Sequence, residues 1–367
     1  MKIERVQSRI VSVPADEPLA GGPAGHGPPR DFVCVSVATK DGLEGIGVTF
    51  FGAALTRALK EAVDALGALI VGDDPRHTEA VADKLRTAGG TGTAGPGGIF
   101  TLALSAIDTA LWDIKGKAAN LPVASLLGGR RTKVPAYASG ALMRTFPLNH
   151  LAKAAETLVK NGYTQMKTQA ALLGDTTPQQ EVERIRVVRQ AIGPDVALMC
   201  DVNQRWTVDQ AISIGRLFEE FHLAWLEDVT AADDFAGLAR VARQLDMPVT
   251  GGEYVYGIAP FRHMLEARSV DIAMIDLFRV GGITQWTKVA GMAEAFNVPV
   301  VSHLIPEIHV HLIAAIPNGR VVEYMPWTMR LFEDPPVPVR GEMTVPTGPG
   351  LGLRFSAEIR RRFAAAE

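Results

Sequence analysis

From residue 134 onward, short runs of apolar residues alternate with stretches of helical apolar spacing, and this alternation limits the possible folds more than any other feature of the chain. Strands that alternate with helices in this way form parallel βα units. Eight such units fit a closed (β/α)8 barrel better than an open doubly wound sheet. The predicted strands cover residues 134–138, 163–167, 196–201, 223–227, 247–250, 272–276, 298–303 and 320–324.

The first third of the chain has a different pattern. Residues 3–13 and 32–38 alternate as strands, whereas 53–86 and 100–119 have helical spacing, which indicates a small α+β domain. We therefore expect three parts: an α+β domain over 1–125, a barrel over 126–336, and a surface segment over 337–367 that packs back on the first domain.

A loop rich in glycine and proline separates the first two predicted strands. It covers residues 18–30 and carries two polar side chains, His26 and Arg30. Such a composition is typical of an exposed segment without regular structure. The loop is therefore a candidate lid.

The composition is that of an ordinary globular protein, with 47% apolar and 21% charged residues. A formal net charge of −3 gives no basic surface for nucleic acid or an anionic membrane, so a small neutral or anionic ligand is the better hypothesis. Cys34 and Cys200 are too few for a disulfide framework or a four-thiolate zinc site, and no signal peptide or membrane span is apparent. These features predict a cytoplasmic protein.

Six consecutive predicted strands each deliver one polar residue at the carboxyl end. Their spacings are 26, 26, 23, 27 and 20 residues, about one βα unit each. On a barrel, side chains at the carboxyl ends of the strands converge on one mouth, which is where barrel enzymes carry out their chemistry. The six residues are Asp201, Glu227, Glu253, Asp276, His303 and Glu323.

The first three of these residues are carboxylates on neighbouring strands. Asp201, Glu227 and Glu253 would repel one another unless protons or a cation neutralised them. A ligand set made only of oxygen favours Mg²⁺, with Mn²⁺ as a substitute, over zinc or copper. Such a metal can stabilise the enediolate that forms when a proton is removed next to a carboxylate.

Asp276 and His303 suit a base and the group that orients it, because a carboxylate fixes the imidazole tautomer and raises its basicity. A lone histidine in a loop would more often be solvated, but the pairing with Asp276 favours the catalytic hypothesis. Lys167, at the end of its strand, could neutralise a substrate carboxylate or could be a surface lysine. Asn203 and Arg279 lie two or three residues beyond site acids and are candidate contacts, whereas the alternating pattern assigns His309 and His311 to helix packing or the surface.

These residues lie in motifs that resemble the mandelate racemase subgroup of the enolase superfamily over nearly the whole chain. In some relatives the position of Asp276 is a lysine, so aspartate there favours the racemase-like subgroup. The motifs are Met199-Cys200-Asp201-Val202-Asn203-Gln204, Trp225-Leu226-Glu227-Asp228, Gly251-Gly252-Glu253, Ile275-Asp276 with Gly281-Gly282-Ile283-Thr284, Val301-Ser302-His303-Leu304 with Glu307-Ile308, and Val322-Glu323.

The resemblance implies an α/β fold: a modified (β/α)7β barrel under an α+β capping domain that the C-terminal segment completes. It implies that the three carboxylates bind Mg²⁺, that His303 paired with Asp276 is the base, and that Glu323 bonds to the substrate carboxylate. It also implies that the loop 18–30 closes over a small carboxylic acid, and that the protein is a homo-oligomer, a dimer or an octamer. Candidate substrate contacts are Gln169, Asn203, His26, Arg30 and Tyr137.

One position departs from the family pattern. Racemases of the family carry Lys-x-Lys at the end of the second strand, but this chain has Lys167-Thr168-Gln169, and glutamine cannot take a proton. Racemisation needs a base on each face of the α-carbon, whereas dehydration can proceed with His303 alone. We therefore predict a Mg²⁺-dependent dehydratase of a sugar acid that yields a 2-keto-3-deoxy acid. The alternatives are a racemase or epimerase with a second base such as His26, and a barrel that binds metal and acid without turnover.

Overall fold

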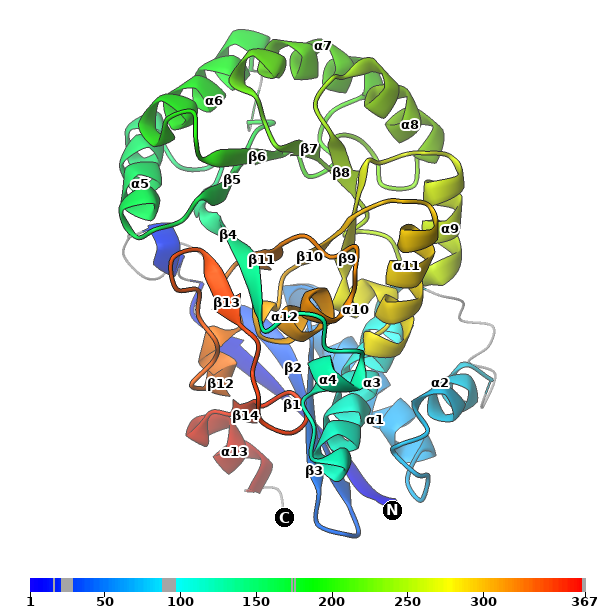
Figure 1. Ribbon diagram of the computed structural model, residues 1–367. Coiled ribbons are helices and arrows are strands. Elements are labelled where there is room, and N and C mark those ends of the chain that lie inside the picture. Colours follow the sequence, from blue (N-terminus) through cyan, green and yellow to red (C-terminus); the bar gives the residue numbers. More distant parts are fainter. Residues whose placement is uncertain (16, 21–28, 88–96, 173, 175, 365–367) are drawn as a thin grey trace.

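The computed structural model describes residues 1–15, 17–20, 29–87, 97–172, 174 and 176–364. Figure 1 shows a ring of strands surrounded by helices, with the N-terminal sheet and its helices packed below it. The predicted α/β class, a barrel with an α+β N-terminal part, is confirmed. Within these described ranges, no helix has the length and apolar character needed to cross a membrane.

The N-terminal part is a three-stranded antiparallel sheet with helices against it. One strand was not predicted: β3 contains Gly45 and Gly47, which weaken the sequence signal for a strand. Both glycines are required by packing. A Cβ on Gly45 would lie 2.1 Å from the Ala110 carbonyl oxygen, and a Cβ on Gly47 would lie 2.0 Å from the Ala106 carbonyl oxygen. The elements are β1 (Ile3–Val13), β2 (Arg30–Thr39), β3 (Glu44–Thr49), α1 (Thr56–Leu69), α2 (Thr78–Thr87) and α3 (Gly98–Ala119).

All eight predicted barrel strands are present, as the parallel sheet β10-β9-β8-β7-β6-β5-β4-β11. A bridge between Val300 and Gly319 joins the two ends of this order and closes the ring. The strands are β4 (Lys133–Leu142), β5 (Gln165–Gln169), β6 (Ala197–Asp201), β7 (Trp225–Glu227), β8 (Val249–Gly251), β9 (Ile272–Asp276), β10 (Val300–His303) and β11 (Val322–Tyr324).

Helices follow the first seven barrel strands, and in the described part of the chain no α-helix directly follows β11, which gives the (β/α)7β arrangement. The short helix α4 (Val123–Leu126) precedes the barrel. The barrel helices are α5 (Leu148–Lys160), α6 (Pro178–Ile192), α7 (Val208–Phe218), α8 (Phe235–Gln244), α9 (Ile258–Glu266), α10 (Leu277–Val280), α11 (Ile283–Ala295) and α12 (Pro306–Ala315).

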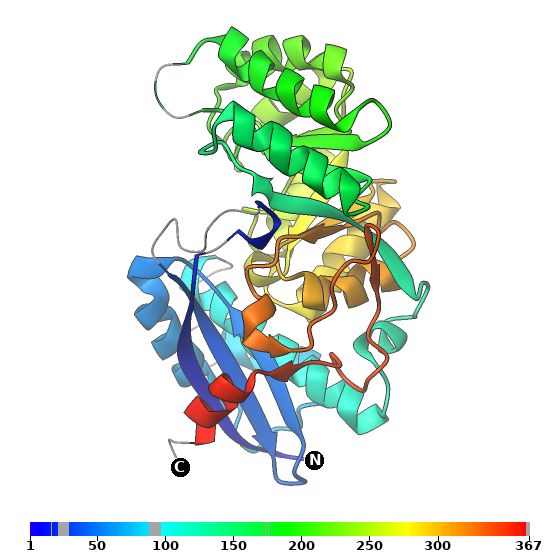
Figure 2. The ribbon, with the colours of Figure 1, turned by 90° about the vertical axis from the view of Figure 1, so that its left-hand side faces the viewer.

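The C-terminal segment contacts both the barrel and the N-terminal sheet. Its strand β13 (Glu342–Thr344) pairs with β4, and its helix α13 (Ala357–Ala364) packs beside β1, as the turned view in Figure 2 also shows. The Arg9 Nε donates to the Arg362 carbonyl oxygen at 3.0 Å. The other two strands of this part of the chain, β12 (Phe332–Glu333) and β14 (Arg354–Phe355), pair with each other in antiparallel orientation.

His311 on α12 is buried and joins three parts of the fold. Its Nδ1 accepts a hydrogen bond from the Ala124 N–H at 3.3 Å, and its Nε2 lies 2.9 Å from the Leu351 carbonyl oxygen. Only the neutral ring, with its proton on Nε2, can make both bonds. Burial accordingly lowers the pKa of His311 from 6.5 to about 4.

We therefore expect the protein to lose stability as the pH falls from about 6.5 towards 4, because the unfolded chain then binds a proton at His311 that the folded chain does not. The shift corresponds to about 3 kcal/mol, at 1.36 kcal/mol per pKa unit. The substitution His311→Gln keeps an acceptor and a donor without titrating. Urea unfolding measures the free energy of unfolding at pH 7.5 and pH 5. Its decrease between the two pH values should be smaller in this variant than in the wild-type protein, and unchanged in His263→Gln, which alters a half-exposed histidine.

Candidate active site

The alternation of side chains along the strands places the predicted site residues inside the barrel mouth. Met199, Trp225, Met274, Val301 and Val321 belong to one buried cluster that fills the barrel interior. Because side chains two positions apart on a strand share a face, the residue two positions after each of them also points inward. Those residues are Asp201, Glu227, Asp276, His303 and Glu323.

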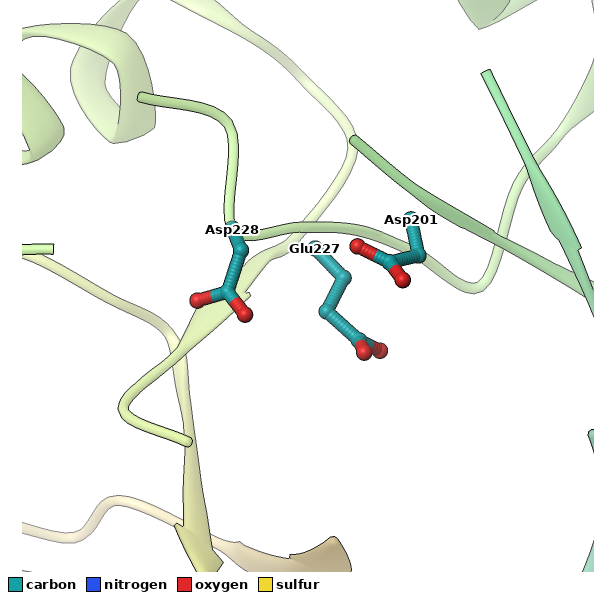
Figure 3. Close-up of side chains that lie close together, drawn as sticks. All are labelled: Asp201, Glu227 and Asp228. Carbon is teal, nitrogen blue, oxygen red and sulfur yellow. The ribbon is translucent and has the colours of Figure 1, made fainter. Parts of the chain in front are cut away.

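Three buried carboxylates form the tightest group of possible cation ligands. Asp201, Glu227 and Asp228 each offer an oxygen, and these atoms all lie within 4.8 Å of one another (Figure 3). Sequence reasoning assigned no role to Asp228, although it directly follows Glu227. Its backbone has a φ of 44°, and one of its buried oxygens has no hydrogen-bond partner among the described residues.

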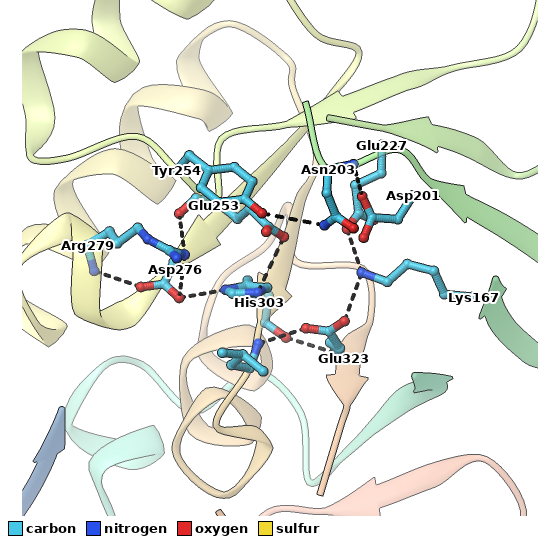
Figure 4. Close-up of polar contacts among 12 residues, drawn as sticks. Lys167, Asp201, Asn203, Glu227, Glu253, Tyr254, Asp276, Arg279, His303 and Glu323 are labelled. Atoms are coloured by element: carbon cyan, nitrogen blue, oxygen red, sulfur yellow. Dashed lines mark hydrogen bonds and ion pairs between the residues drawn. The ribbon is translucent and has the colours of Figure 1, made fainter. Parts of the chain in front are cut away.

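Glu253, the predicted third ligand, lies just after β8 and faces the same space. Its Oε2 is 3.4 Å from the His303 Nε2, and it is not part of the group of three. Figure 4 shows Glu253 between His303 and Tyr254, across the mouth from Lys167. Its role as a ligand therefore stays a prediction, with Asp228 as a further oxygen donor nearby.

The electrostatics of the group favour a cation. Burial raises the pKa of Glu227 to about 8 and that of Asp201 to about 6, and repulsion between the carboxylates adds to both shifts, while the positive charge of Lys167 opposes them. The donors are all oxygen atoms, which suits a hard divalent cation. A divalent cation would relieve the repulsion that the protein alone leaves in place.

Lys167 is buried inside the barrel, which excludes the hypothesis of a surface lysine. Its Nζ lies 2.5 Å from the Glu227 Oε1 and 2.8 Å from the Glu323 Oε1. Burial acts to raise the pKa of Glu323, but Lys167 outweighs it and lowers that pKa to about 2. Glu323 is therefore ionised in this arrangement, and its predicted hydrogen bond to a substrate carboxylate would require Glu323 to take up a proton.

His303 and Asp276 form the predicted pair. The His303 Nδ1 lies 2.6 Å from the Asp276 Oδ2, and the other oxygen of Asp276 accepts the Arg279 N–H at 2.7 Å (Figure 4). Asp276 thus directs the His303 Nε2 into the mouth, as a general base requires. The Arg279 guanidinium lies 3.6 Å from Asp276 and donates to the Glu253 carbonyl oxygen at 3.0 Å, so Arg279 holds Asp276 in place.

The pKa of His303 depends on the charge of Glu253. Burial acts to lower this pKa, but the negative charge of Glu253 and the bond to Asp276 outweigh burial and raise the pKa to about 9. An imidazole must be neutral to accept a proton. A cation that neutralises Glu253 would lower the pKa of His303 and so increase the neutral fraction of the base at neutral pH.

Gln169 and Asn203 lie together on the side of the mouth opposite His303. The Gln169 Nε2 donates to the Asn203 Oδ1 at 3.2 Å, and the Asn203 Nδ2 donates to the Tyr254 hydroxyl at 3.4 Å. The Asn203 N–H also donates to Asp201 at 2.7 Å. In place of a second base, this side of the mouth therefore presents neutral amides.

The other predicted contacts lie farther from the mouth or outside the described part of the chain. Tyr137 is fully buried beneath Lys167, whose Nζ lies 5.4 Å from the ring centroid. Arg30 forms an ion pair with Glu17 and lies over the Trp327 ring at 4.0 Å. His26 lies outside the described residues. Direct contact of these three residues with substrate stays a prediction.

Sequence reasoning missed Arg144, which lies beside Gln169 and Asn203. The predicted first strand ended at residue 138, whereas β4 continues to Leu142 and carries the chain to the mouth. Arg144 then lies two residues beyond the strand, at the same level as the other site residues. A longer strand prediction would have placed it there.

Two family models match the chain. The model described as "Enolase C-terminal domain-like" matches residues 150–359, and the one described as "Mandelate racemase / muconate lactonizing enzyme, N-terminal domain" matches residues 25–128. Together they cover most of the N-terminal part and the barrel from α5 onward, while β4 lies between the two matched ranges. The predicted resemblance is confirmed.

Curated relatives and solved structures of similar length also resemble this chain over nearly its full length. An L-talarate/galactarate dehydratase of Salmonella typhimurium is 31% identical, over 98% of this chain and 90% of the relative. A 3,6-anhydro-alpha-L-galactonate cycloisomerase of Streptomyces coelicolor is 31% identical, over 99% of both chains. The crystal structure of an L-talarate dehydratase from a Polaromonas species, complexed with Mg and L-glucarate, matches with a TM-score of 0.89 and 31% identity, over 98% of this chain and 96% of that one.

Proposed function

Because this chain belongs to the mandelate racemase / muconate lactonizing enzyme family of the enolase superfamily, we propose that it is a Mg²⁺-dependent dehydratase of a sugar acid. The substrate would lose the proton next to its carboxylate and its β-hydroxyl, and the product would be a 2-keto-3-deoxy acid. One observation carries the proposal: the buried pair of His303 and Asp276 is intact, whereas the opposite side of the mouth carries Gln169, which cannot act as a base.

The mechanism follows from the residues of the chain. The His303 Nε2, oriented by Asp276, takes the α-proton, and the imidazolium returns that proton to the departing β-hydroxyl, which leaves as water. Lys167 faces the negative charge that develops on the substrate carboxylate. Magnesium, held by Asp201 and Glu227 with Glu253 or Asp228, would supply further positive charge at that carboxylate.

Binding of Mg²⁺ near pH 7 should release protons, because burial raises the pKa of Glu227 to about 8 and a ligand carboxylate must be ionised. The part of the release that comes from Glu227 should decrease as the pH rises above 8, where Glu227 is already ionised in the free protein, whereas the part that comes from His303 should continue to about pH 9. Calorimetric titration with MgCl2 in buffers of different ionisation enthalpy measures the number of protons. Binding at pH 7 without proton release would show that Glu227 is ionised before the metal arrives.

Proton NMR in D2O tests the proposed reaction. The protein, with Mg²⁺ and a panel of four- to six-carbon mono- and diacid sugars, should give 2-keto-3-deoxy signals from at least one acid, and EDTA should abolish them. Exchange of the α-proton without loss of water would instead support a racemase or epimerase. A complete absence of exchange and of product over the panel would contradict the proposal.

A cycloisomerase is the second candidate, because one relative of that activity is 31% identical over 99% of both chains. Adding an anhydro sugar acid, whose β-oxygen is part of a ring, to the same NMR panel separates the two. Keto-deoxy product from that acid without loss of water, and none from the open-chain acids, would favour the cycloisomerase. The oligomeric state is a separate proposal. Sedimentation of the purified protein would test whether it forms a homo-oligomer.

A further inference from the structure

Arg144 carries a buried positive charge at the barrel mouth for which the proposed mechanism has no use. Its side chain is 9% exposed, and its Nε is buried without a hydrogen-bond partner among the described residues. One terminal nitrogen of the guanidinium donates to the Asn203 Oδ1, a neutral acceptor. Burying a guanidinium against neutral groups is costly unless an anion joins it.

The two other cations among the site residues described above have carboxylate partners. Lys167 contacts Glu227 and Glu323, and Arg279 contacts Asp276. For Arg144, no carboxylate of the described chain lies within the 4.0 Å of an ion pair. Asp201 attracts it from a greater distance, and a cation bound to Asp201 would cancel that attraction.

The position of Arg144 is fixed by a buried scaffold. Its backbone N–H donates to the Gln169 Oε1 at 3.2 Å. The guanidinium of the buried Arg184 donates to the backbone carbonyls on both sides of Arg144, those of Met143 and Phe146, and to the Gln169 carbonyl at 2.6 Å. A charge held this firmly, before any ligand arrives, is preorganised for binding.

Arg144 lies on the outer side of the groups that would receive the reacting end of the substrate, and across the ring from β10, which carries His303. It contacts Gln169 and Asn203, which follow Lys167 and Asp201 by two residues each and so lie nearer the opening of the mouth. Lys167 and the cation ligands, one layer deeper, would hold the carboxylate next to the reacting carbon. The guanidinium is therefore placed toward the outer end of a sugar acid, and a guanidinium is best matched by a second carboxylate.

We propose that Arg144 binds the distal carboxylate of a dicarboxylic sugar acid and so selects diacids over monoacids. The inference rests on the proposed function, because it deepens the choice of substrate for the same site. Arg144 acts here as a specificity residue. It contributes neither a proton nor a metal ligand to the reaction.

Calorimetric binding to a variant that cannot turn over tests this. The Mg²⁺-loaded His303→Asn protein is titrated with three matched pairs of acids: galactarate and galactonate, glucarate and gluconate, xylarate and xylonate. For the preferred configuration, the diacid should bind about 30-fold or more tightly than its monoacid, the range expected for one buried charge pair. Adding Arg144→Gln should reduce this ratio to within about 3-fold, and Arg144→Lys should restore part of it.

Arg205→Gln is the matched control, since Arg205 is a nearby but exposed arginine, and it should leave the ratio unchanged. The inference would be overturned if diacid and monoacid bound equally tightly, or if Arg144→Gln reduced the affinity for both acids by the same factor. Its failure is separable from that of the proposed function. Keto-deoxy product from monoacids alone would support the dehydratase and refute the role of Arg144, whereas selective diacid binding without such product would do the reverse.

Discussion

The substitution His303→Asn is expected to lower kcat for keto-deoxy product by about 10⁴-fold or more, because the same imidazole removes the α-proton and protonates the departing hydroxyl. Asparagine can still bond to Asp276 but cannot carry a proton between the two positions. The exchange of the α-proton in D2O should disappear together with the product. Both are measured by proton NMR with Mg²⁺ and the acid that the wild-type protein converts.

Two measurements separate this loss from a folding defect. Mg²⁺ affinity and the midpoint of thermal unfolding should stay close to the wild-type values, because His303 is not a predicted ligand. His263→Asn, on the exposed surface of α9, should retain full activity. Substantial turnover in His303→Asn would sink the assignment of His303 as the base.

The substitution Glu227→Gln should weaken Mg²⁺ binding by more than about 100-fold and abolish turnover at ordinary Mg²⁺ concentrations. Changes to groups that only support ligands cost about 10- to 100-fold, so the loss of a charged ligand should exceed that range. Glutamine preserves the shape of the side chain and an acceptor for the Trp225 Nε1–H, which lies 2.8 Å from Glu227. Lys167 keeps its contact with Glu323.

Trp225 provides the measurement for this variant. Because its indole donates directly to Glu227, titration with MgCl2 should change the tryptophan fluorescence of the wild-type protein, and Trp225→Phe should remove most of the change. Glu220→Gln, which alters an exposed acid close in sequence, is the control and should bind Mg²⁺ normally. Unchanged Mg²⁺ affinity in Glu227→Gln would exclude Glu227 as a ligand and would direct attention to Asp228 and Glu253.

The barrel could be predicted because its signal is local. Each strand is a short apolar run, and the polar residue that ends it is visible without knowing where any other strand lies. The site residues Asp201, Asp276 and His303 therefore follow from position alone: each is the last residue of a strand whose inward face is apolar two positions earlier. The strand β3 escaped prediction because its glycines serve the packing of another element, α3.

Contacts across the ring could not be predicted, because they depend on how the strands curve and close. Lys167 was equally compatible with the surface until the structure placed it between Glu227 and Glu323. The grouping of Asp228 with Asp201, and the approach of Arg144 to Asn203, join residues on different strands and loops at distances that no spacing in the sequence encodes.

The sequence by itself thus determined the barrel and most of the polar residues at its mouth, since the periodicity of strands and helices is written in neighbouring residues. The tertiary structure alone decided which of those residues touch, which carboxylates lie close enough to hold a cation together, and that Arg144 has no carboxylate of the described residues within ion-pair distance. The physical reason is that pairing and pKa depend on distances and burial, and both arise only when the barrel closes.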